Sequence, residues 1–285
     1  MNTSLYRKEI ILPSGTRFIY SEFTPSLNQV PTRIIICMHG FHMSSEEFTP
    51  FIQNAFKFSN STIFVAINYT NFGVSISPNP ITLFSIIQDL HQFFHLYRMS
   101  MSNIPIYILA YSIGTYFLTY WLSQFPEDCK FITRIIQYAP MMVLLFPQEI
   151  ELRFPSWEYL FCLYFKKKTF PKLTKWFGIK SKSYLHHKKY EGEKILESII
   201  DIRGGSAIIR NSFDIQRLYD IHVDMDLIYG ENDRLAPHFL AKQFQEKFPH
   251  LYKNVYILPN ENHLLFFSQP GVENLNRLIF TNILH

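Results

Sequence analysis

Apolar and polar positions alternate along the chain in blocks that predict a regular series of strands and helices. Near-continuous apolar runs occupy residues 33–38, 62–68, 104–109, 134–138, 223–229 and 255–258. Such runs are typical of strands buried on both faces of a parallel sheet. Earlier in the chain, residues 8–12 and 17–22 flank the turn sequence Pro13-Ser14-Gly15, which predicts an antiparallel hairpin. The six runs and the two hairpin strands together predict an eight-stranded sheet.

Between the predicted strands, apolar residues recur at the three- and four-residue spacing of amphipathic helices. The expected helices cover residues 44–58, 81–97, 115–125, 239–248 and 271–284. Because strands and helices alternate, we expect an α/β fold with a mostly parallel sheet flanked by helices. Residues 141–221 interrupt this alternation with a segment rich in aromatic residues and lysine. We therefore expect a core of residues 1–140 and 222–285 and an inserted lid, or cap, of residues 141–221 over the carboxyl ends of the strands.

Composition restricts this picture further. The 285 residues are 47% hydrophobic and 18% charged, which indicates a globular chain rather than a disordered one. A net charge of +4 is too small to indicate nucleic-acid binding. The three cysteines form no disulfide framework and no Cys-x-x-Cys pair, so we expect no metal site and a reducing compartment. No apolar run reaches the length of a membrane span or resembles a signal core, and we expect a cytoplasmic protein, soluble or peripheral to membranes.

The most informative motif follows the strand at residues 104–109. Residues 110–114 read Ala-Tyr-Ser-Ile-Gly and precede the helix expected at 115–125. A serine flanked at two residues' distance by Ala110 and Gly114 is typical of the tight, strained turn on which hydrolases present a nucleophile. Ser112 is therefore a candidate nucleophile.

An acid and a histidine follow this serine in the order that such a hydrolase needs. Asp233 comes directly after the strand at 223–229, with Glu231 as a rival carboxylate, and His263 comes after the strand at 255–258. The aspartate would orient the imidazole, and the histidine would carry the proton of Ser112. Each residue alone has an ordinary structural explanation, such as a turn aspartate or a surface histidine. Their common placement at strand ends predicts the catalytic triad Ser112, Asp233 and His263.

Backbone and apolar groups complete the predicted site. We expect the oxyanion hole to use the N–H groups of Ile113 and of Phe41, which follows the strand ending in His39-Gly40. An apolar pocket that suits an acyl chain is expected from Phe41, Met141, Met142, Leu145 and Leu264. A place in the hydrophobic core is the alternative for the residues around 264–267.

With these motifs, the sequence resembles the serine hydrolases of the α/β-hydrolase superfamily, and among them the monoacylglycerol lipase-like group of the serine aminopeptidase S33 type. The motifs that carry the resemblance are residues 34–40, 68–75, 110–114, 229–233 and 262–263. The resemblance implies the same triad and a lid after the sixth strand. The chain departs from the family pattern at Asn68, where Asp is usual, at Asn71-Phe72 in place of Gly-His, and at Ala110 in place of Gly.

The inserted segment is unusually basic and aromatic. Residues 153–190 contain one acidic residue, Glu158, and ten basic residues: Arg153, Lys166, Lys167, Lys168, Lys172, Lys175, Lys180, Lys182, Lys188 and Lys189. This composition predicts peripheral contact with anionic membranes. A solvated lysine face over a packed lid is the alternative. Nucleic acid is not expected as a partner, because no recognition motif accompanies the charge.

These observations lead to one main functional hypothesis and two alternatives. We expect a serine carboxylic-ester hydrolase, a lipase or esterase, whose substrate is a monoacylglycerol or a related small lipid ester, with no metal or organic cofactor. A serine aminopeptidase of the same fold is the first alternative, and it would need a lid carboxylate such as Glu149, Glu151 or Glu158. A non-catalytic binding protein that has kept the fold is the second. The sequence indicates no oligomeric state.

Overall fold

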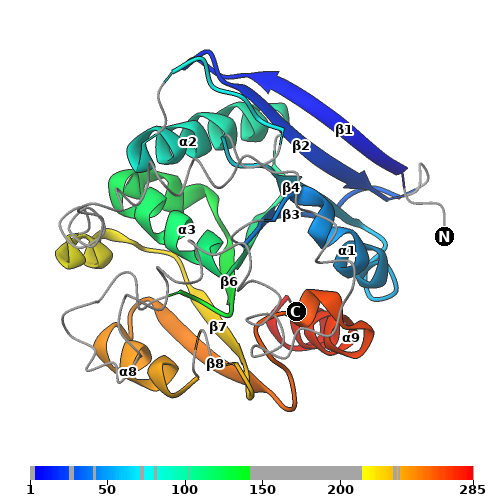
Figure 1. Cartoon of the computed structure of the whole chain (residues 1–285), viewed down its shortest axis with the longest axis vertical. Coiled ribbons are helices and arrows are strands. Elements are labelled where there is room, and N and C mark those ends of the chain that lie inside the picture. Colours follow the sequence, from blue (N-terminus) through cyan, green and yellow to red (C-terminus); the bar gives the residue numbers. More distant parts are fainter. Residues whose placement is uncertain are drawn as a thin grey trace, which may run out of the picture.

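A computed structural model describes residues 4–25, 29–40, 43–70, 74–79, 82–101, 103–141, 214–233, 236 and 238–284 of the chain. Its centre is one eight-stranded sheet in the order β1-β2-β4-β3-β5-β6-β7-β8 (Figure 1). The strands are β1 (Ser4–Ile11), β2 (Arg17–Thr24), β3 (Arg33–Met38), β4 (Thr62–Ile67), β5 (Ile106–Tyr111), β6 (Arg134–Tyr138), β7 (Met225–Gly230) and β8 (Tyr252–Leu258). The expected eight-stranded sheet is therefore confirmed.

The direction of the strands follows the apolar pattern. β1 and β2 form the predicted hairpin, and β2 runs antiparallel to β4, whereas all other neighbours are parallel. Every residue of β4 and β7 is buried, as expected for strands that are covered on both faces. The edge strand β8 alternates less strictly and exposes part of one face. Because β3 to β8 are parallel, their carboxyl ends gather along a single edge of the sheet.

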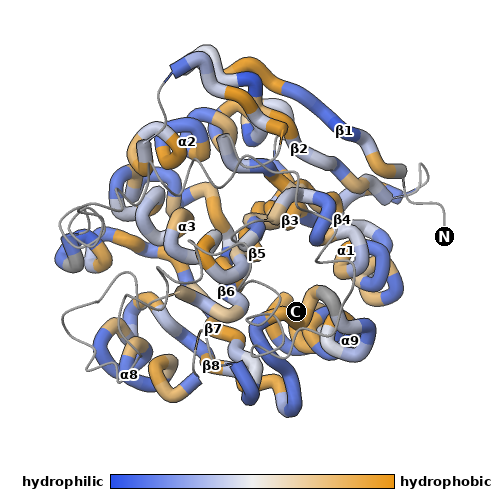
Figure 2. The backbone as a smooth tube through the Cα atoms, viewed as in Figure 1, coloured by the Kyte–Doolittle hydropathy of each residue, from blue (hydrophilic) through white to orange (hydrophobic). Residues whose placement is uncertain are grey.

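Helices cover both faces of this sheet. The long α2 (Leu83–Ser100) and α3 (Ile113–Gln124) lie on one face together with α8 (Phe239–Lys247), and α1 (Thr49–Ala55) and α9 (Gln269–Leu278) lie on the other (Figure 1). Short 3₁₀ helices lie at residues Ser45–Phe48 (η1), Pro126–Phe131 (η2), Ile215–Asp220 (η5) and Leu265–Phe267 (η6), and Ile279–Ile283 is a π-helix. Hydrophobic residues concentrate at the central strands, and hydrophilic ones occur on the outer turns of α2 and α8 (Figure 2). This is the layered arrangement that the alternating pattern predicts.

The first and last helices on the α1 side are joined by a buried polar contact. Asn276 on α9 is fully buried, and its Nδ2 donates to the carbonyl oxygen of Phe51 at 3.0 Å and to Oδ1 of Asn54 at 3.2 Å. These bonds connect parts of the chain that are more than 220 residues apart. They hold α9, near the end of the chain, against α1.

A second buried polar group connects the β1–β2 hairpin to helix α2. The carboxylate of Asp89 on α2 is buried and accepts hydrogen bonds from the hydroxyls of Ser14, Thr16 and Thr70 at 2.7, 3.0 and 2.5 Å. A buried carboxylate needs such donors to offset its desolvation. The hairpin turn, helix α2 and the segment after β4 therefore meet at one point.

The observed bounds differ from the expected ones mainly at helix ends. α3 begins at Ile113, two residues earlier than expected, and η2 follows it in a stretch for which the sequence predicted no element. Most of the predicted lid, residues 142–213, lies outside the described residues. The remainder of that segment includes η5, where Leu218 is fully buried and Arg217 donates to Gln124 of α3 at 3.0 Å. Among the described residues, the structure contains no helix whose length and apolar character would suit a bilayer crossing.

Candidate active site

Ser112 occupies a strained turn between β5 and α3. Its backbone lies at φ 53° and ψ −122°, a conformation that residues with a side chain rarely adopt. The N–H of Ser112 donates to the carbonyl oxygen of Tyr138 at 3.0 Å, which ties the turn to the neighbouring strand β6. The sharp turn projects the serine hydroxyl from the carboxyl edge of the sheet. This is the geometry that the sequence motif predicts.

The small residues around Ser112 are explained by close contacts. A Cβ atom added to Gly114 would lie 2.7 Å from the carbonyl oxygens of Met38 and His39 and from the hydroxyl of Tyr69. Helix α3 therefore starts against the end of β3 with no room for a side chain. Ala110 is fully buried in β5 and is paired with Met38 on one side. Its methyl group is accommodated, so the departure from glycine at this position leaves the turn intact.

The structure brings the three predicted side chains together. Oγ of Ser112 lies 2.8 Å from Nε2 of His263, and Nδ1 of His263 lies 2.9 Å from Oδ2 of Asp233. Ser112, Asp233 and His263 are each less than a tenth exposed. The rival carboxylate, Glu231, is exposed and accepts the backbone N–H of Asn260 at 2.8 Å. Asp233 is thus the carboxylate that contacts the imidazole.

Two tyrosines that the sequence analysis did not single out hold the histidine loop. The hydroxyl of Tyr111, at the end of β5, donates to the carbonyl oxygen of His263 at 2.7 Å. The hydroxyl of Tyr138, at the end of β6, donates to the carbonyl oxygen of Asn262 at 2.6 Å. Both rings are almost fully buried. A polar-tipped aromatic residue at the end of a buried strand is the signal that could have identified them.

The loops that carry the acid and the histidine are interlocked. The N–H of Asn232 donates to the carbonyl oxygen of Glu261 at 2.8 Å, and a Cβ atom on Gly230 would lie 2.7 Å from that same oxygen. The second carboxylate oxygen of Asp233, Oδ1, accepts the N–H of Ala236 at 2.8 Å. One carboxylate oxygen of Asp233 therefore accepts a hydrogen bond from its own loop, and the other contacts the imidazole of His263. Its orientation is fixed before any substrate binds.

One of the two predicted oxyanion donors lies within the described residues. Ile113 is the first residue of α3, and N–H groups in the first turn of a helix have no acceptor within that helix. The hydroxyl of Thr115 donates to the carbonyl oxygen of Ser112 at 2.6 Å and accepts the N–H of Met141 at 3.0 Å. These bonds hold the start of α3 and place the Ile113 N–H beside the serine. Phe41, the other predicted donor, lies outside the described residues.

Hydrogen bonds hold Asn68 and Ser75, two described residues of the segment that follows β4. Oδ1 of Asn68 accepts the N–H of Ser45 at 2.9 Å, and its Nδ2 donates to the carbonyl oxygen of Ile19 at 3.2 Å. A carboxylate could accept the first bond but could not donate the second. Ser75 donates to the carbonyl oxygen of Asn68 at 2.9 Å and accepts the N–H of Ile19 at 2.9 Å. Asn68 is thus suited to this site, whereas Asn71 and Phe72 lie outside the described residues.

Of the predicted pocket residues, Met141 and Leu264 are described. Both are partly buried and pack against the hydrophobic core. Their neighbour Phe266 is buried, and its ring contacts that of Tyr111 with centroids 4.9 Å apart. For residues 265 and 266 the core alternative therefore holds. Phe41, Met142 and Leu145 lie outside the described residues.

Burial shifts the pKa of several groups around the triad. Desolvation raises the pKa of Glu261, which follows β8, and hydrogen bonding to Asn274 partly opposes this. Burial, together with the charges of Asp233 and Glu261, raises the pKa of the Tyr138 hydroxyl well above its usual range. Full burial lowers the pKa of His39 to about 4, so this histidine is neutral near pH 7. Its ring packs on Tyr69, with centroids 4.3 Å apart, which gives it a structural position at the end of β3.

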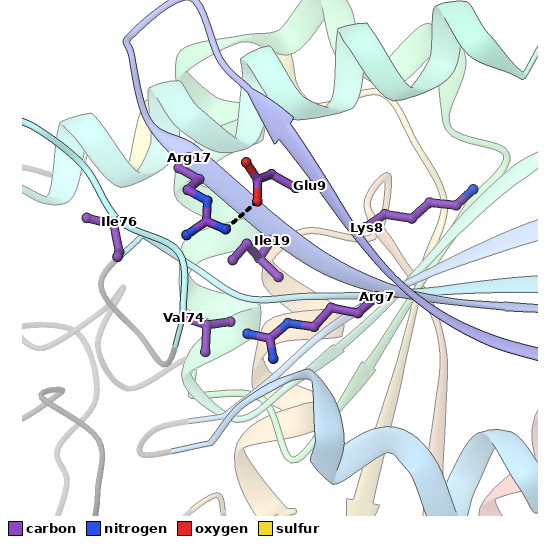
Figure 3. A pocket seen from close by; sticks show the side chains of 7 residues that line it. All are labelled: Arg7, Lys8, Glu9, Arg17, Ile19, Val74 and Ile76. Atoms are coloured by element: carbon purple, nitrogen blue, oxygen red, sulfur yellow. Dashed lines mark ion pairs between the residues drawn. The ribbon is translucent and has the colours of Figure 1, made fainter.

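A separate pocket lies beside the β1–β2 hairpin and contains no triad residue. It is lined by Arg7, Lys8, Glu9, Arg17, Ile19, Val74 and Ile76 (Figure 3). Arg17 forms an ion pair with Glu9 at 2.6 Å, and this bond lowers the pKa of the Glu9 carboxyl. Both partners are roughly half exposed, where an ion pair contributes little stability. The mixed charges of this pocket do not suit an acyl chain.

The family comparison covers most of the chain. A sequence model of the family described as serine aminopeptidase S33 (Hydrolase_4) matches residues 29–270. This span includes Ser112, Asp233 and His263. No curated protein matches the sequence.

Solved structures share the fold at low sequence identity. A bromoperoxidase from Bacillus anthracis has a TM-score of 0.70 at 16% identity, with 98% of this chain and 99% of that chain covered. The esterase EaEST from Exiguobacterium antarcticum has a TM-score of 0.66 at 14% identity, with 97% and 98% covered. Est1E from Butyrivibrio proteoclasticus, solved with ferulic acid, has a TM-score of 0.60 at 14% identity, with 94% and 97% covered. At these identities the likeness shows the fold alone.

Proposed function

Because the chain belongs to the serine aminopeptidase S33 family of α/β-hydrolases, we propose that it is a serine hydrolase that cleaves carboxylic esters through an acyl-enzyme on Ser112. One observation carries this proposal. Ser112, on a backbone strained to φ 53°, lies 2.8 Å from the imidazole of His263, which in turn lies 2.9 Å from Asp233. A hydroxyl, a base and an orienting carboxylate in this sequence of contacts can activate a nucleophile.

The reaction follows from these contacts in two halves. Oγ of Ser112 attacks the ester carbonyl carbon while Nε2 of His263 takes the hydroxyl proton, and Asp233 stabilises the imidazolium that forms. Collapse of the tetrahedral intermediate breaks the bond to the alcohol, which leaves with the proton from His263. Water then attacks the acyl-enzyme, again with His263 as base, and releases the acid and the free serine.

The negative charge on the tetrahedral oxygen needs hydrogen-bond donors that are already in place. We assign this role to the N–H of Ile113, and the support is that Ile113 begins α3, at the positive end of the helix dipole. The N–H of Phe41 is proposed as the second donor from the sequence position alone. Removing one such donor typically lowers the rate by about 10²–10³-fold.

For the substrate, we propose a monoacylglycerol or a related lipid ester. Support comes from the apolar residues that adjoin the triad, Met141 and Leu264, and from the aromatic residues of the segment that follows Met141 in sequence. The mechanism needs no metal and no organic cofactor at this site.

A fluorophosphonate probe tests whether Ser112 is an activated nucleophile. We expect the full-length protein to form one adduct, on the peptide that contains Ser112, and the Ser112→Ala variant to form none. Ser123→Ala is a matched control, because Ser123 is also buried on α3; its hydroxyl donates to the carbonyl oxygen of Tyr120 and accepts from the amide of Gln124. Folded protein that fails to label at Ser112 would exclude a serine hydrolase and favour a binding protein of the same fold.

A substrate panel separates the ester and peptide alternatives. It would contain p-nitrophenyl esters of graded chain length, a monoacylglycerol and aminoacyl p-nitroanilides. The name of the family makes an aminopeptidase the second candidate, and its three candidate carboxylates, Glu149, Glu151 and Glu158, lie outside the described residues. We expect esters of medium or long chains to be preferred. Faster cleavage of the aminoacyl amides would overturn the ester proposal and leave the labelling result intact.

We also propose that the basic segment of residues 153–190 docks on anionic bilayers and delivers the lipid ester. The support is its ten basic residues against one acid. Co-sedimentation with neutral and anionic vesicles tests the proposal, with Lys166, Lys167 and Lys168 replaced together by glutamine in the variant. We expect the protein to prefer anionic vesicles and the variant to lose that preference. Equal binding to both kinds of vesicle would refute docking through this charge.

A further inference from the structure

Three side chains that can hold a metal ion meet where helix α2 approaches the end of α3. His91 and His95 are four residues apart on α2 and so project from the same face of that helix. Asp128 lies on η2, directly after α3. Nδ1 of His91 lies 2.8 Å from Oδ2 of Asp128, and Nε2 of His95 lies 2.7 Å from Oδ1. One ligand atom from each of the three residues lies within 4.8 Å of the other two.

We propose that His91, His95 and Asp128 form a binding site for a zinc ion. Two imidazole nitrogens and a carboxylate oxygen are ligands that zinc accepts, whereas calcium and magnesium prefer oxygen alone. Bonds of about 2.0–2.1 Å in a tetrahedron place ligand atoms roughly 3.3 Å apart. The two histidines contact different oxygens of Asp128, so an ion held by both oxygens would widen the two nitrogen–oxygen contacts by about half an ångström as it replaces the protons between them.

The surroundings hold the ligands in place and leave room for the ion to enter. The Asp128 side chain is fully buried, and its Oδ2 also accepts the indole N–H of Trp121 at 2.7 Å. The ring of His91 stacks on Phe125, with centroids 4.0 Å apart. Contacts of this kind orient the ligands of a metal site. The side chains of His91 and His95 are 23% and 32% exposed, so water can reach the site and complete the coordination.

Nearby positive charge limits the affinity. Arg98 and Lys130 both lie over the ring of Phe131, at 3.6 and 4.7 Å from its centroid. That ring is in contact with His95, with centroids 6.1 Å apart. In the absence of an ion, the hydrogen bonds from the two histidines and Trp121 satisfy Asp128. We therefore expect moderate, micromolar binding rather than the very tight binding of a zinc finger.

The site is remote from the serine, so its effect is on stability. Ser112 caps the start of α3, whereas Asp128 follows the end of this 12-residue helix. At a rise of about 1.5 Å per residue, the helix separates the two points by roughly 18 Å. A bound ion would connect α2 to the segment that leads into β6. Zinc should therefore raise the melting temperature and leave labelling of Ser112 unchanged.

Cobalt provides the spectroscopic test, because it takes the same ligands and absorbs visible light. Full-length protein freed of metal with a chelator would be titrated with Co²⁺, and Zn²⁺ would then be added. We expect visible absorption that saturates at one ion per chain and disappears as zinc displaces cobalt. At a zinc concentration about 100 times the dissociation constant, the melting temperature should rise by roughly 5 °C or more.

Glutamine variants locate the site without removing its hydrogen bonds. His91→Gln and His95→Gln can each still donate to Asp128, but they lose the ligand nitrogen, and each should weaken zinc binding at least 100-fold. His250→Gln is a control at a partly buried histidine outside the cluster, and His263→Gln tests binding at the triad; both should retain the cobalt absorption. The proposal is overturned if no saturable absorption appears. It is also overturned if His91→Gln and His95→Gln bind like the wild type, or if either control variant abolishes binding.

Discussion

Replacing Asp233 by asparagine measures how much the orienting carboxylate contributes. In the wild type, Oδ2 of Asp233 lies 2.9 Å from Nδ1 of His263, and the Asp233 side chain is fully buried. When His263 becomes an imidazolium, its positive charge is attracted by the negative charge of Asp233. At a distance of 2.9 Å and an effective dielectric constant of 20, this attraction stabilises the imidazolium by about 6 kcal/mol. Because about 1.4 kcal/mol corresponds to a factor of ten, we expect kcat to fall roughly 10⁴-fold. The same substitution in a serine protease triad has an effect of this order.

Glu231→Gln is the matched control for this experiment. Glu231 lies two residues away, is exposed, and accepts the N–H of Asn260, a bond that the glutamine oxygen can also accept. We expect its kcat/KM on the preferred ester to stay within about threefold of the wild type. Both variants should be compared by initial rates and by thermal melting, which separates lost chemistry from lost folding. A loss in Glu231→Gln as large as in Asp233→Asn, or near-normal activity in Asp233→Asn, would refute the assignment of the acid.

Three further perturbations address the frame around the triad. Gly114→Ala places a Cβ atom 2.7 Å from three oxygen atoms and should destabilise the fold by about 1–3 kcal/mol; an unchanged melting temperature would contradict this close packing. Tyr111→Phe removes the bond to the carbonyl oxygen of His263, so we expect roughly 3–10-fold lower kcat with an unchanged KM. A fall in kcat/KM that came from a higher KM alone would argue against a positioning role. Burial lowers the pKa of His39 from 6.5 to about 4, so between these values the unfolded chain binds a proton that the native chain does not. The free energy of unfolding should therefore fall as the pH drops through this window, by up to about 3 kcal/mol, and fall less in His39→Asn; parallel urea titrations of the two proteins would decide.

The sequence predicted the features that follow from pattern and order. Buried strands are visible as apolar runs, and the candidate triad is visible because Ser112, Asp233 and His263 each follow such a run. Contacts between side chains and distant backbone atoms are not visible in this way. Tyr111 was part of the motif, yet its hydroxyl bonds to the carbonyl oxygen of His263, 152 residues later, and this bond depends on how the loop after β8 docks.

The proposed metal site also depends on contacts that the sequence does not reveal. It combines His91, His95 and Asp128 from two separate elements. The absence of a Cys-x-x-Cys pair led to the expectation of no metal site. The four-residue spacing of His91 and His95 is a usable signal, since it places both rings on one face of α2. Asp128 has no such signal, because it joins them only through the packing of η2 against α2.

The interlocked histidine and aspartate loops have a consequence for the order of folding. Ser112 belongs to the first half of the chain, whereas Asp233 follows β7 and His263 follows β8. Strand β7 pairs with β6 from residue 135 to residue 228, and β8 pairs with β7. Contacts this distant in sequence form late, because the entropy of closing a long loop is lost before the new contacts stabilise the chain. A nascent chain would thus carry an inert serine until its last two strands dock. The appearance of probe labelling at Ser112 during refolding would time the completion of the sheet.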